Sequence, residues 1–190
     1  MNLTVVKIGG SLMGASELSL CLDKIESASK QTNYLIVPGG GKFADSIRQL
    51  QKQHRFDDIA AHQMALLAMC QYGYYLKQIK SALIVIRNNE QIKANLDKKS
   101  PLLWLPYCLI GDDSEIESSW DMTSDSIALW LATKLDAKKL ILIKSKELSN
   151  DREQIVKHIE NNDLDKAFVK YAERFSGELL FYSKQQYSQL

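Results

Sequence analysis

The sequence has few cysteines, almost no net charge and no long apolar run, and each of these absences excludes a class of protein. Its three cysteines, Cys21, Cys70 and Cys108, lie far apart among apolar neighbours and show no Cys-x-x-Cys spacing. We therefore expect buried, reduced thiols in a cytoplasmic protein. A formal net charge of +1 provides no field that would attract nucleic acid or an anionic membrane. No apolar run approaches the roughly 20 residues that cross a bilayer, and we expect no leader because the first residues lack a basic segment.

Several catalytic signatures are also missing. The chain has no Gly-x-x-x-x-Gly-Lys-Ser/Thr phosphate loop, no Gly-x-Gly-x-x-Gly after its first apolar run and no protein-kinase signature set. No cluster of His, Cys or carboxylate residues has the spacing of a zinc site, and no Gly-x-Ser-x-Gly elbow occurs. These absences remove support for a hydrolase or a metalloprotein, and we expect no metal ligands among the side chains.

The chain does contain an alternation of apolar runs and helical patterns, within 190 residues that are 45% hydrophobic and 25% charged. This length and composition fit one domain over residues 1–190. Apolar runs predict strands at 3–8, 34–37, 82–86, 102–105, 139–143 and 177–182. Helical spacing predicts helices at 17–29, 43–50, 57–80, 88–96, 124–135, 151–160 and 164–175, and a polar loop is expected at 111–119. The alternation is typical of an α/β fold with a largely parallel sheet.

The first predicted strand ends in a pattern that suits a phosphate. Lys7 is followed by Gly9, Gly10 and Ser11, where the chain turns into a helix. A buried strand fixes the lysine, the glycines let backbone N–H groups approach an anion, and a helix N-terminus adds positive potential. Taken alone, the same residues also fit a strand-to-helix turn that uses Gly-Gly only for its geometry.

Two further features are expected at the same edge of the sheet, because the carboxyl ends of parallel strands lie together there. The glycine turn Gly39-Gly40-Gly41 closes the second strand and is followed by Lys42. Later, Thr123-Ser124-Asp125 opens a helix, with one of the two hydroxyl residues as its N-cap. Asp125 is then either a simple helix N-terminal acid or a group beside a phosphate that ties down the lysine or helps to hold Mg²⁺.

The predicted helix at 57–80 carries His62 near its start and an apolar stripe from Met64 to Tyr75. A lone histidine at this position is either a surface or capping residue or a functional one. The stripe fits a core face and, equally, an interface with a second copy of the chain.

Three motifs, Val-Val-Lys-Ile-Gly-Gly-Ser-Leu, Val-Pro-Gly-Gly-Gly-Lys-Phe-Ala-Asp and Thr-Ser-Asp-Ser-Ile-Ala, occur in an order that resembles the amino acid kinase family over residues 5–143. The resemblance implies a three-layer αβα sandwich around a largely parallel sheet. Segments 61–72 and 120–128 are similar to the small members that phosphorylate aminomethylfuran-methyl phosphate in methanofuran-type cofactor biosynthesis. This resemblance implies that ATP and Mg²⁺ are the cofactors and that the small-molecule acceptor is a phosphate monoester. It also implies a homo-oligomer.

The resemblance also implies roles for individual residues. Lys7 would contact the transferred phosphoryl group, and Asp125 would organise Lys7 and other positive groups without acting as a base. The phosphate- and nucleotide-binding residues would be Gly9, Gly10, Ser11 and Lys144, with Gly9 and Gly10 donating N–H groups. The substrate-binding residues would be Gly39, Gly40, Gly41, His62, Thr123 and Ser124.

The chain departs from the family pattern after the strand at 139–143. The family usually continues with a Thr-Asp-x-Asp-Gly loop along the nucleotide, whereas this chain reads Lys-Ser-Lys-Glu-Leu at 144–148. One hypothesis is an active kinase whose lysines meet ATP phosphates. The alternative is a non-catalytic ligand-binding or complex-forming protein that retains the fold. A third hypothesis is a kinase with another acceptor, such as an amino-acid carboxylate or a nucleoside monophosphate.

Overall fold

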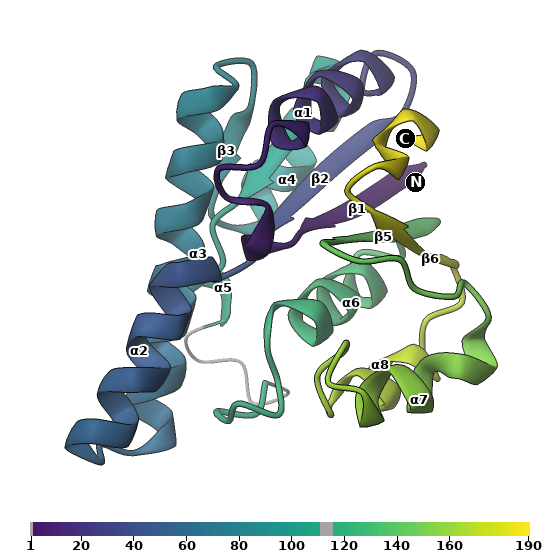
Figure 1. Cartoon of the computed structure of the whole chain (residues 1–190). Helices are drawn as coiled ribbons and strands as arrows, with labels where there is room; N and C mark the ends of the chain where they lie inside the picture. Colours follow the sequence, from purple (N-terminus) through teal and green to yellow (C-terminus); the bar gives the residue numbers. More distant parts are fainter. Residues whose placement is uncertain (1, 111–115) are drawn as a thin grey trace.

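The computed structural model describes residues 2–110 and 116–190, whose strands form one six-stranded sheet (Figure 1). The order across the sheet is β3-β4-β2-β1-β5-β6, and every neighbouring pair is parallel. β1 therefore lies in the interior of the sheet, between β2 and β5. The strands are β1 (Leu3–Ile8), β2 (Asn33–Pro38), β3 (Ile84–Ile86), β4 (Leu102–Trp104), β5 (Lys139–Lys144) and β6 (Glu178–Ser183).

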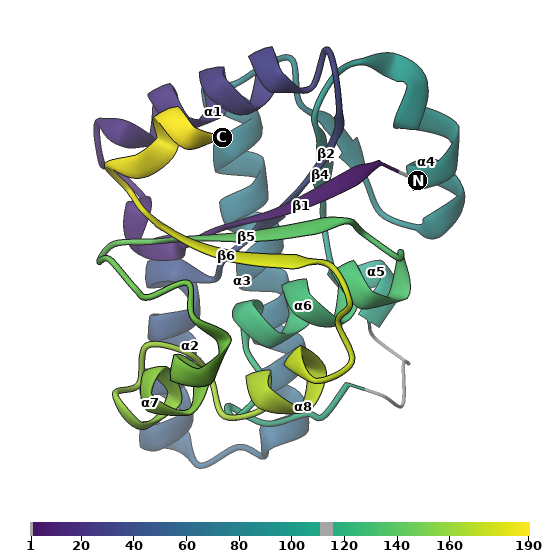
Figure 2. The same cartoon turned by 90° about the vertical axis from the view of Figure 1, so that its right-hand side faces the viewer.

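Helices cover both faces of this sheet (Figure 2). On one face, α1 (Glu17–Ala28) buries its apolar stripe in a cluster with Val6, Ile8 and Ile36. On the other face, the helices contribute to a second apolar cluster with the opposite sides of the same strands. These helices are α6 (Ser124–Lys134), α7 (Ile155–Glu160) and α8 (Phe168–Ala172). Two cores on opposite faces of one sheet confirm the predicted αβα sandwich.

Helices α2 (Gly41–His54) and α3 (Asp58–Ile79) form a pair that reaches beyond the carboxyl ends of the strands (Figure 1). The second half of α3 packs closely on the end of β4, because a Cβ atom at Gly73 would lie 2.5 Å from Cδ2 of Leu105. The first half of α3 and all of α2 are thereby held beyond the sheet, where they can form the wall of a cavity.

The apolar stripe predicted along α3 is only partly buried. Ala68 and Tyr72 are in the core, whereas Leu67 and Tyr75 are exposed. The core-face interpretation therefore holds for part of the stripe, and its exposed members remain available for an interface.

Other predictions differ from the structure in detail. The helix predicted at 164–175 shortens to α8, and the one predicted at 151–160 begins as a 3-10 turn at Arg152–Gln154 before α7. The helix predicted at 88–96 is α4 (Asn89–Asn95), and the short helix α5 (Tyr107–Ile110) has no predicted counterpart. Residues 111–115 of the predicted acidic loop lie outside the described residues.

The cysteines only partly match the expectation of buried thiols. Cys21 is buried, and its burial raises the pKa of the thiol to about 12. Cys70 is half-buried and Cys108 is exposed, and all three are free thiols. Across the described residues, every helix is too short or too polar to cross a membrane.

Candidate functional site

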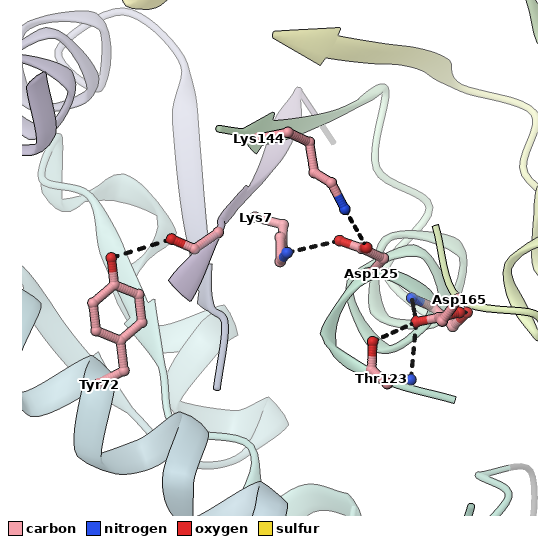
Figure 3. A network of polar contacts seen from close by, with 8 residues as sticks. Lys7, Tyr72, Thr123, Asp125, Lys144 and Asp165 are labelled. Carbon is pink, nitrogen blue, oxygen red and sulfur yellow. Dashed lines mark hydrogen bonds and ion pairs between the residues drawn. The ribbon is translucent and has the colours of Figure 1, made fainter. Parts of the chain in front are cut away.

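A buried carboxylate holds two lysines at the carboxyl edge of the sheet (Figure 3). Lys7 is one residue from the end of β1, and its Nζ lies 2.7 Å from Oδ1 of Asp125. Lys144 ends the neighbouring strand β5, and its Nζ donates to Oδ2 of Asp125 over 2.6 Å. The Lys7 and Asp125 side chains are only 6% and 7% exposed. Each carboxylate oxygen is therefore occupied by a different ammonium group, and the trio carries a net positive charge.

The electrostatics of this trio keep Asp125 ionised. Burial acts to raise the pKa of Asp125, but the positive charges of Lys7 and Lys144 and their hydrogen bonds outweigh it and hold the value at about 2. Burial lowers the pKa of Lys7, against the opposing effect of Asp125. A carboxylate with such a low pKa is a poor general base at neutral pH, whereas it is well suited to fix two cations in place.

Asp165 caps the helix that carries Asp125. Its Oδ2 accepts from the backbone N–H of Thr123 over 2.9 Å, from the Thr123 hydroxyl over 2.7 Å and from the backbone N–H of Ser126 over 3.2 Å. The Ser126 hydroxyl donates to the other oxygen. Thr123 is the N-cap residue, which confirms one of the two predicted candidates, but its hydroxyl donates to Asp165 instead of accepting from the helix.

Asp165 is also electrostatically linked to the site. Burial and the nearby charge of Asp125 raise the pKa of Asp165 to about 6, although the Ser126 and Thr123 hydrogen bonds oppose the shift. The sequence carries no local signal for this residue, because it lies about 40 positions from the helix that it caps. A search for acidic residues in the turns after β5 would have included it among many others.

The two glycine turns touch one another through their backbones. A Cβ atom on Gly10 would overlap the backbone of Gly41, and Gly41 itself has a φ of +54°, in the region that favours glycine. The N–H of Gly9 donates to the Ile143 carbonyl over 3.0 Å, and the N–H of Gly39 donates to the Ile8 carbonyl over 2.9 Å. The expectation that Gly9 donates its N–H to a phosphate is therefore revised, because that N–H joins β1 to β5.

A cavity of about 570 Å³ opens beside these turns, along α2, α3 and the start of α6. Eight of the twelve residues that were expected to have catalytic or binding roles line it, namely Gly10, Ser11, Gly40, Gly41, His62, Thr123, Ser124 and Lys144. Four others, Lys7, Gly9, Gly39 and Asp125, are outside its lining. Lys144 joins the two sets, since it lines the cavity and contacts Asp125.

The outer part of this cavity contains residues that the sequence did not single out. The Arg48 guanidinium lies 4.3 Å from the centre of the Trp120 ring, and the Trp120 indole N–H donates to Gln51 over 2.5 Å. The Gln51 amide in turn donates to Oδ1 of Asp58 over 2.8 Å. These contacts tie α2, the start of α3 and the segment before α6 together around the mouth of the cavity.

His62 lines the same cavity from the second turn of α3. It is 6% exposed, and its Nε2 has no hydrogen-bond partner within the described chain. Burial lowers the pKa of His62, so the ring is neutral at physiological pH. A buried polar atom without a partner costs free energy, and such atoms call for an explanation such as a ligand.

The described residues contain no group of three His, Cys, Asp or Glu side chains placed to hold a metal ion. Both oxygens of Asp125 are already occupied by lysines.

Comparisons with known proteins agree with the motifs and the fold. A model of the amino acid kinase family matches residues 2–179. A [5-(aminomethyl)furan-3-yl]methyl phosphate kinase from Methanocaldococcus jannaschii is 28% identical over 140 residues, which cover 73% of this chain and 63% of that protein. The match thus spans less than two thirds of the relative's length.

Solved structures of nucleotide kinases share the fold. UMP kinase from Ureaplasma parvum superposes with a TM-score of 0.70 at 17% identity, over 97% of this chain and 91% of that one. Uridylate kinase from Archaeoglobus fulgidus gives a TM-score of 0.70 at 15% identity, over 94% and 89% of the two chains. At these identities the likeness concerns the fold alone.

Proposed function

The chain belongs to the amino acid kinase family, and we propose that it is an ATP-dependent small-molecule kinase whose acceptor already carries a phosphate monoester. The observation that carries this proposal is the Lys7–Asp125–Lys144 trio at the carboxyl edge of a parallel sheet. Ligands of open α/β sheets bind at this edge. A fixed, net positive group there suits the transfer of a phosphoryl group.

Phosphoryl transfer needs little covalent chemistry from the protein, because it depends on alignment and on compensation of negative charge. Lys7 would offset charge on the transferred group, and Lys144 would contact the nucleotide phosphates from the cavity side. Asp125 would hold both ammonium groups in position, so that little reorganisation is needed during the reaction. ATP, with Mg²⁺ bound to its phosphates, would supply the transferred group.

The residues that line the cavity support the proposal for the acceptor. Gly40 and Gly41 allow close approach of an acceptor phosphate to the backbone, and Lys42 adds positive charge at the same turn. Thr123 and Ser124 line the same cavity. The M. jannaschii relative is named for an aminomethylfuran-methyl phosphate, and we propose an acceptor of this kind, used in the biosynthesis of a one-carbon carrier.

A second candidate is a non-catalytic ligand-binding protein with the kinase fold. The segment after β5 favours it, because Lys146 forms an ion pair with Asp163 instead of facing the cavity, and the family's acidic loop is absent. Of residues 144–148, all of which the structure describes, Lys144 alone lines the cavity. The two candidates differ in nucleotide binding.

The test is acceptor-dependent release of ADP by the purified protein with Mg-ATP and the aminomethylfuran-methyl phosphate. We expect turnover by the unaltered protein, loss of at least about 100-fold in Lys7→Ala, and normal turnover in Lys138→Ala, an exposed lysine remote from the trio. Absence of turnover together with no heat of ATP or ADP binding in calorimetry would favour the non-catalytic alternative.

We further propose a cytoplasmic homo-oligomer. Exposed apolar residues of α3, among them Ile59, Leu67 and Tyr74, are a candidate contact surface between copies of the chain. Light scattering at micromolar concentration should give a mass of at least twice 21.6 kDa. A mass of one chain would contradict the proposal.

A further inference from the structure

The cavity beside the phosphate turns has a chemical gradient along α3. From the mouth inward, this helix presents a carboxylate at Asp58, an imidazole at His62, and an apolar wall at Leu66 and Met69. Residues four apart on a helix share one face and are separated by about 6 Å along its axis. The inner end, with Gly41 and the lysines, suits a phosphate, whereas the outer end carries a carboxylate and an imidazole.

The carboxylate of Asp58 accepts a hydrogen bond from a neutral side chain. Its Oδ1 accepts from the neutral Gln51 amide, and within residues 2–110 and 116–190 it forms no ion pair with a basic side chain. By contrast, the other acid in the cavity wall, Asp45, lies 3.9 Å from the Arg48 guanidinium on the same helix. Asp58, in the first turn of α3, thus adds a negative charge without an ion-pair partner among residues 2–110 and 116–190 to a cavity that otherwise suits anions.

His62 provides an independent reason to place a ligand here. Its Nε2 is buried without a hydrogen-bond partner among residues 2–110 and 116–190, and His62 lies one helical turn along α3 from Asp58. A neutral imidazole accepts one hydrogen bond at its unprotonated nitrogen. An ammonium group has three donors and no acceptor, so it could satisfy a carboxylate and an imidazole nitrogen at once.

We propose that Asp58 and His62 form a subsite for a primary ammonium group on the acceptor, at the end of the cavity opposite its phosphate. This inference rests on the proposed function. The ring of the acceptor would lie against Leu66 and Met69, with its phosphate at the glycine turns and its amine at Asp58 and His62. The pair is a specificity determinant: it selects a zwitterionic phosphate ester over an anionic one of similar shape.

The experiment compares two acceptors that differ only in the amine. One is the aminomethylfuran-methyl phosphate, and the other carries a methyl group in place of the aminomethyl group. Binding is measured by calorimetry, and turnover by ADP release. We expect the unaltered protein to bind the amine at least about 10-fold more tightly, because hydrogen bonds to charged groups are among the stronger ones.

Two variants and a matched control locate the effect. Asp58→Asn keeps an oxygen for the Gln51 amide but removes the charge, and it should reduce the preference for the amine to less than about threefold. His62→Phe keeps the ring volume and removes Nε2, and it should weaken binding of the amine but not of the methyl analogue. Asp57→Asn removes the same charge one residue away, where the side chain caps α3 at the Ala60 N–H, and it should keep the full preference.

The outcomes separate this inference from the kinase proposal. Equal binding of the two acceptors to the unaltered protein, or a preference that survives in Asp58→Asn, overturns the ammonium subsite even if both acceptors are phosphorylated. An equal loss of the preference for the amine in Asp57→Asn overturns it as well, because the effect would then come from the general negative potential of the two neighbouring acids. A preference that depends on Asp58 without any turnover upholds the subsite and contradicts the kinase proposal.

Discussion

Lys144 donates a hydrogen bond from Nζ to Oδ2 of Asp125 over 2.6 Å. The contact joins the end of β5 to the first turn of α6 and places a second cation beside the one at Lys7. Because Lys144 also lines the cavity, it is the member of the trio with direct access to a ligand. Residues 144–148, which lack the family's acidic loop, thus retain one basic group at the site.

Lys144→Ala should reduce kcat/KM for ATP by about 100-fold, because a fixed positive group is lost from a phosphoryl-transfer site. The measurement is steady-state ADP release at varied ATP. Lys146→Ala serves as the matched control from the same segment, since the Lys146 ammonium is engaged by Asp163. We expect this control to keep its kcat/KM within about threefold. Equal losses in the two variants would mean that the segment contributes only a general positive charge.

Asp125→Asn should destabilise the protein as well as inactivate it. The substitution keeps the shape but leaves two ammonium groups, one of them buried, without their counter-charge. Removal of one partner from a buried ion pair typically costs about 3–5 kcal/mol. Asp121→Asn is the comparison, because Asp121 pairs with Lys166 on the surface and exposed pairs contribute about 0–1 kcal/mol. Urea denaturation of both variants measures the difference, and similar midpoints would contradict the buried pairing.

The raised pKa of Asp165 predicts that the stability of the folded protein changes with pH in a definite direction. Its pKa is about 6 in the folded protein against an ordinary value of 3.8, so the folded state binds the proton more tightly than the unfolded state does. The corresponding stabilisation is complete below pH 3.8 and is lost as the pH rises to about 6. The Tm of the unaltered protein minus that of Asp165→Asn should therefore fall between about pH 4 and pH 6 and stay constant above about pH 7.

The contribution of Asp125 has the opposite sign, because its pKa is lowered to about 2. Its stabilisation is present above pH 3.8 and is lost as the pH falls towards 2. Melting curves above about pH 4 therefore report Asp165 with little interference from Asp125. A difference in Tm that is flat from pH 4 to pH 7 would contradict the raised pKa of Asp165.

The parts of the fold that were predictable from the sequence depend on local patterns. The apolar run that ends at Ile8, the glycine turn at Gly39–Gly41 and the start of α6 at Ser124 are each set by neighbouring residues. Parallel pairing then follows from strand–helix alternation, and it brings these segments to one edge of the sheet. Lys7 and Asp125 were predictable partners for this reason.

The remaining features depend on residues that are distant in the sequence. Asp165 reaches Thr123 and Ser126 only because the turn before α8 folds against the start of α6. Gly9 was expected to face a ligand, but its N–H completes the ladder to Ile143. Cys108 was expected in the core on the basis of apolar neighbours, but it lies on the exposed side of α5. Hydrophobic neighbours in sequence do not decide which face of a short helix is buried.

Contact between the two glycine turns leads to the last prediction. Gly10→Ala would place a methyl group against the backbone of Gly41, and the turns would have to separate. We expect a destabilisation of about 1–3 kcal/mol and a loss of ATP and acceptor binding together, since both turns border the cavity. Gly14→Ala is the control: Gly14 has a φ of +80° but open space around it, so backbone strain should cost about 1 kcal/mol while binding stays unchanged. Calorimetry and denaturation of the two variants test this difference, and normal ligand binding by Gly10→Ala would show that close contact of the turns is unnecessary for the site.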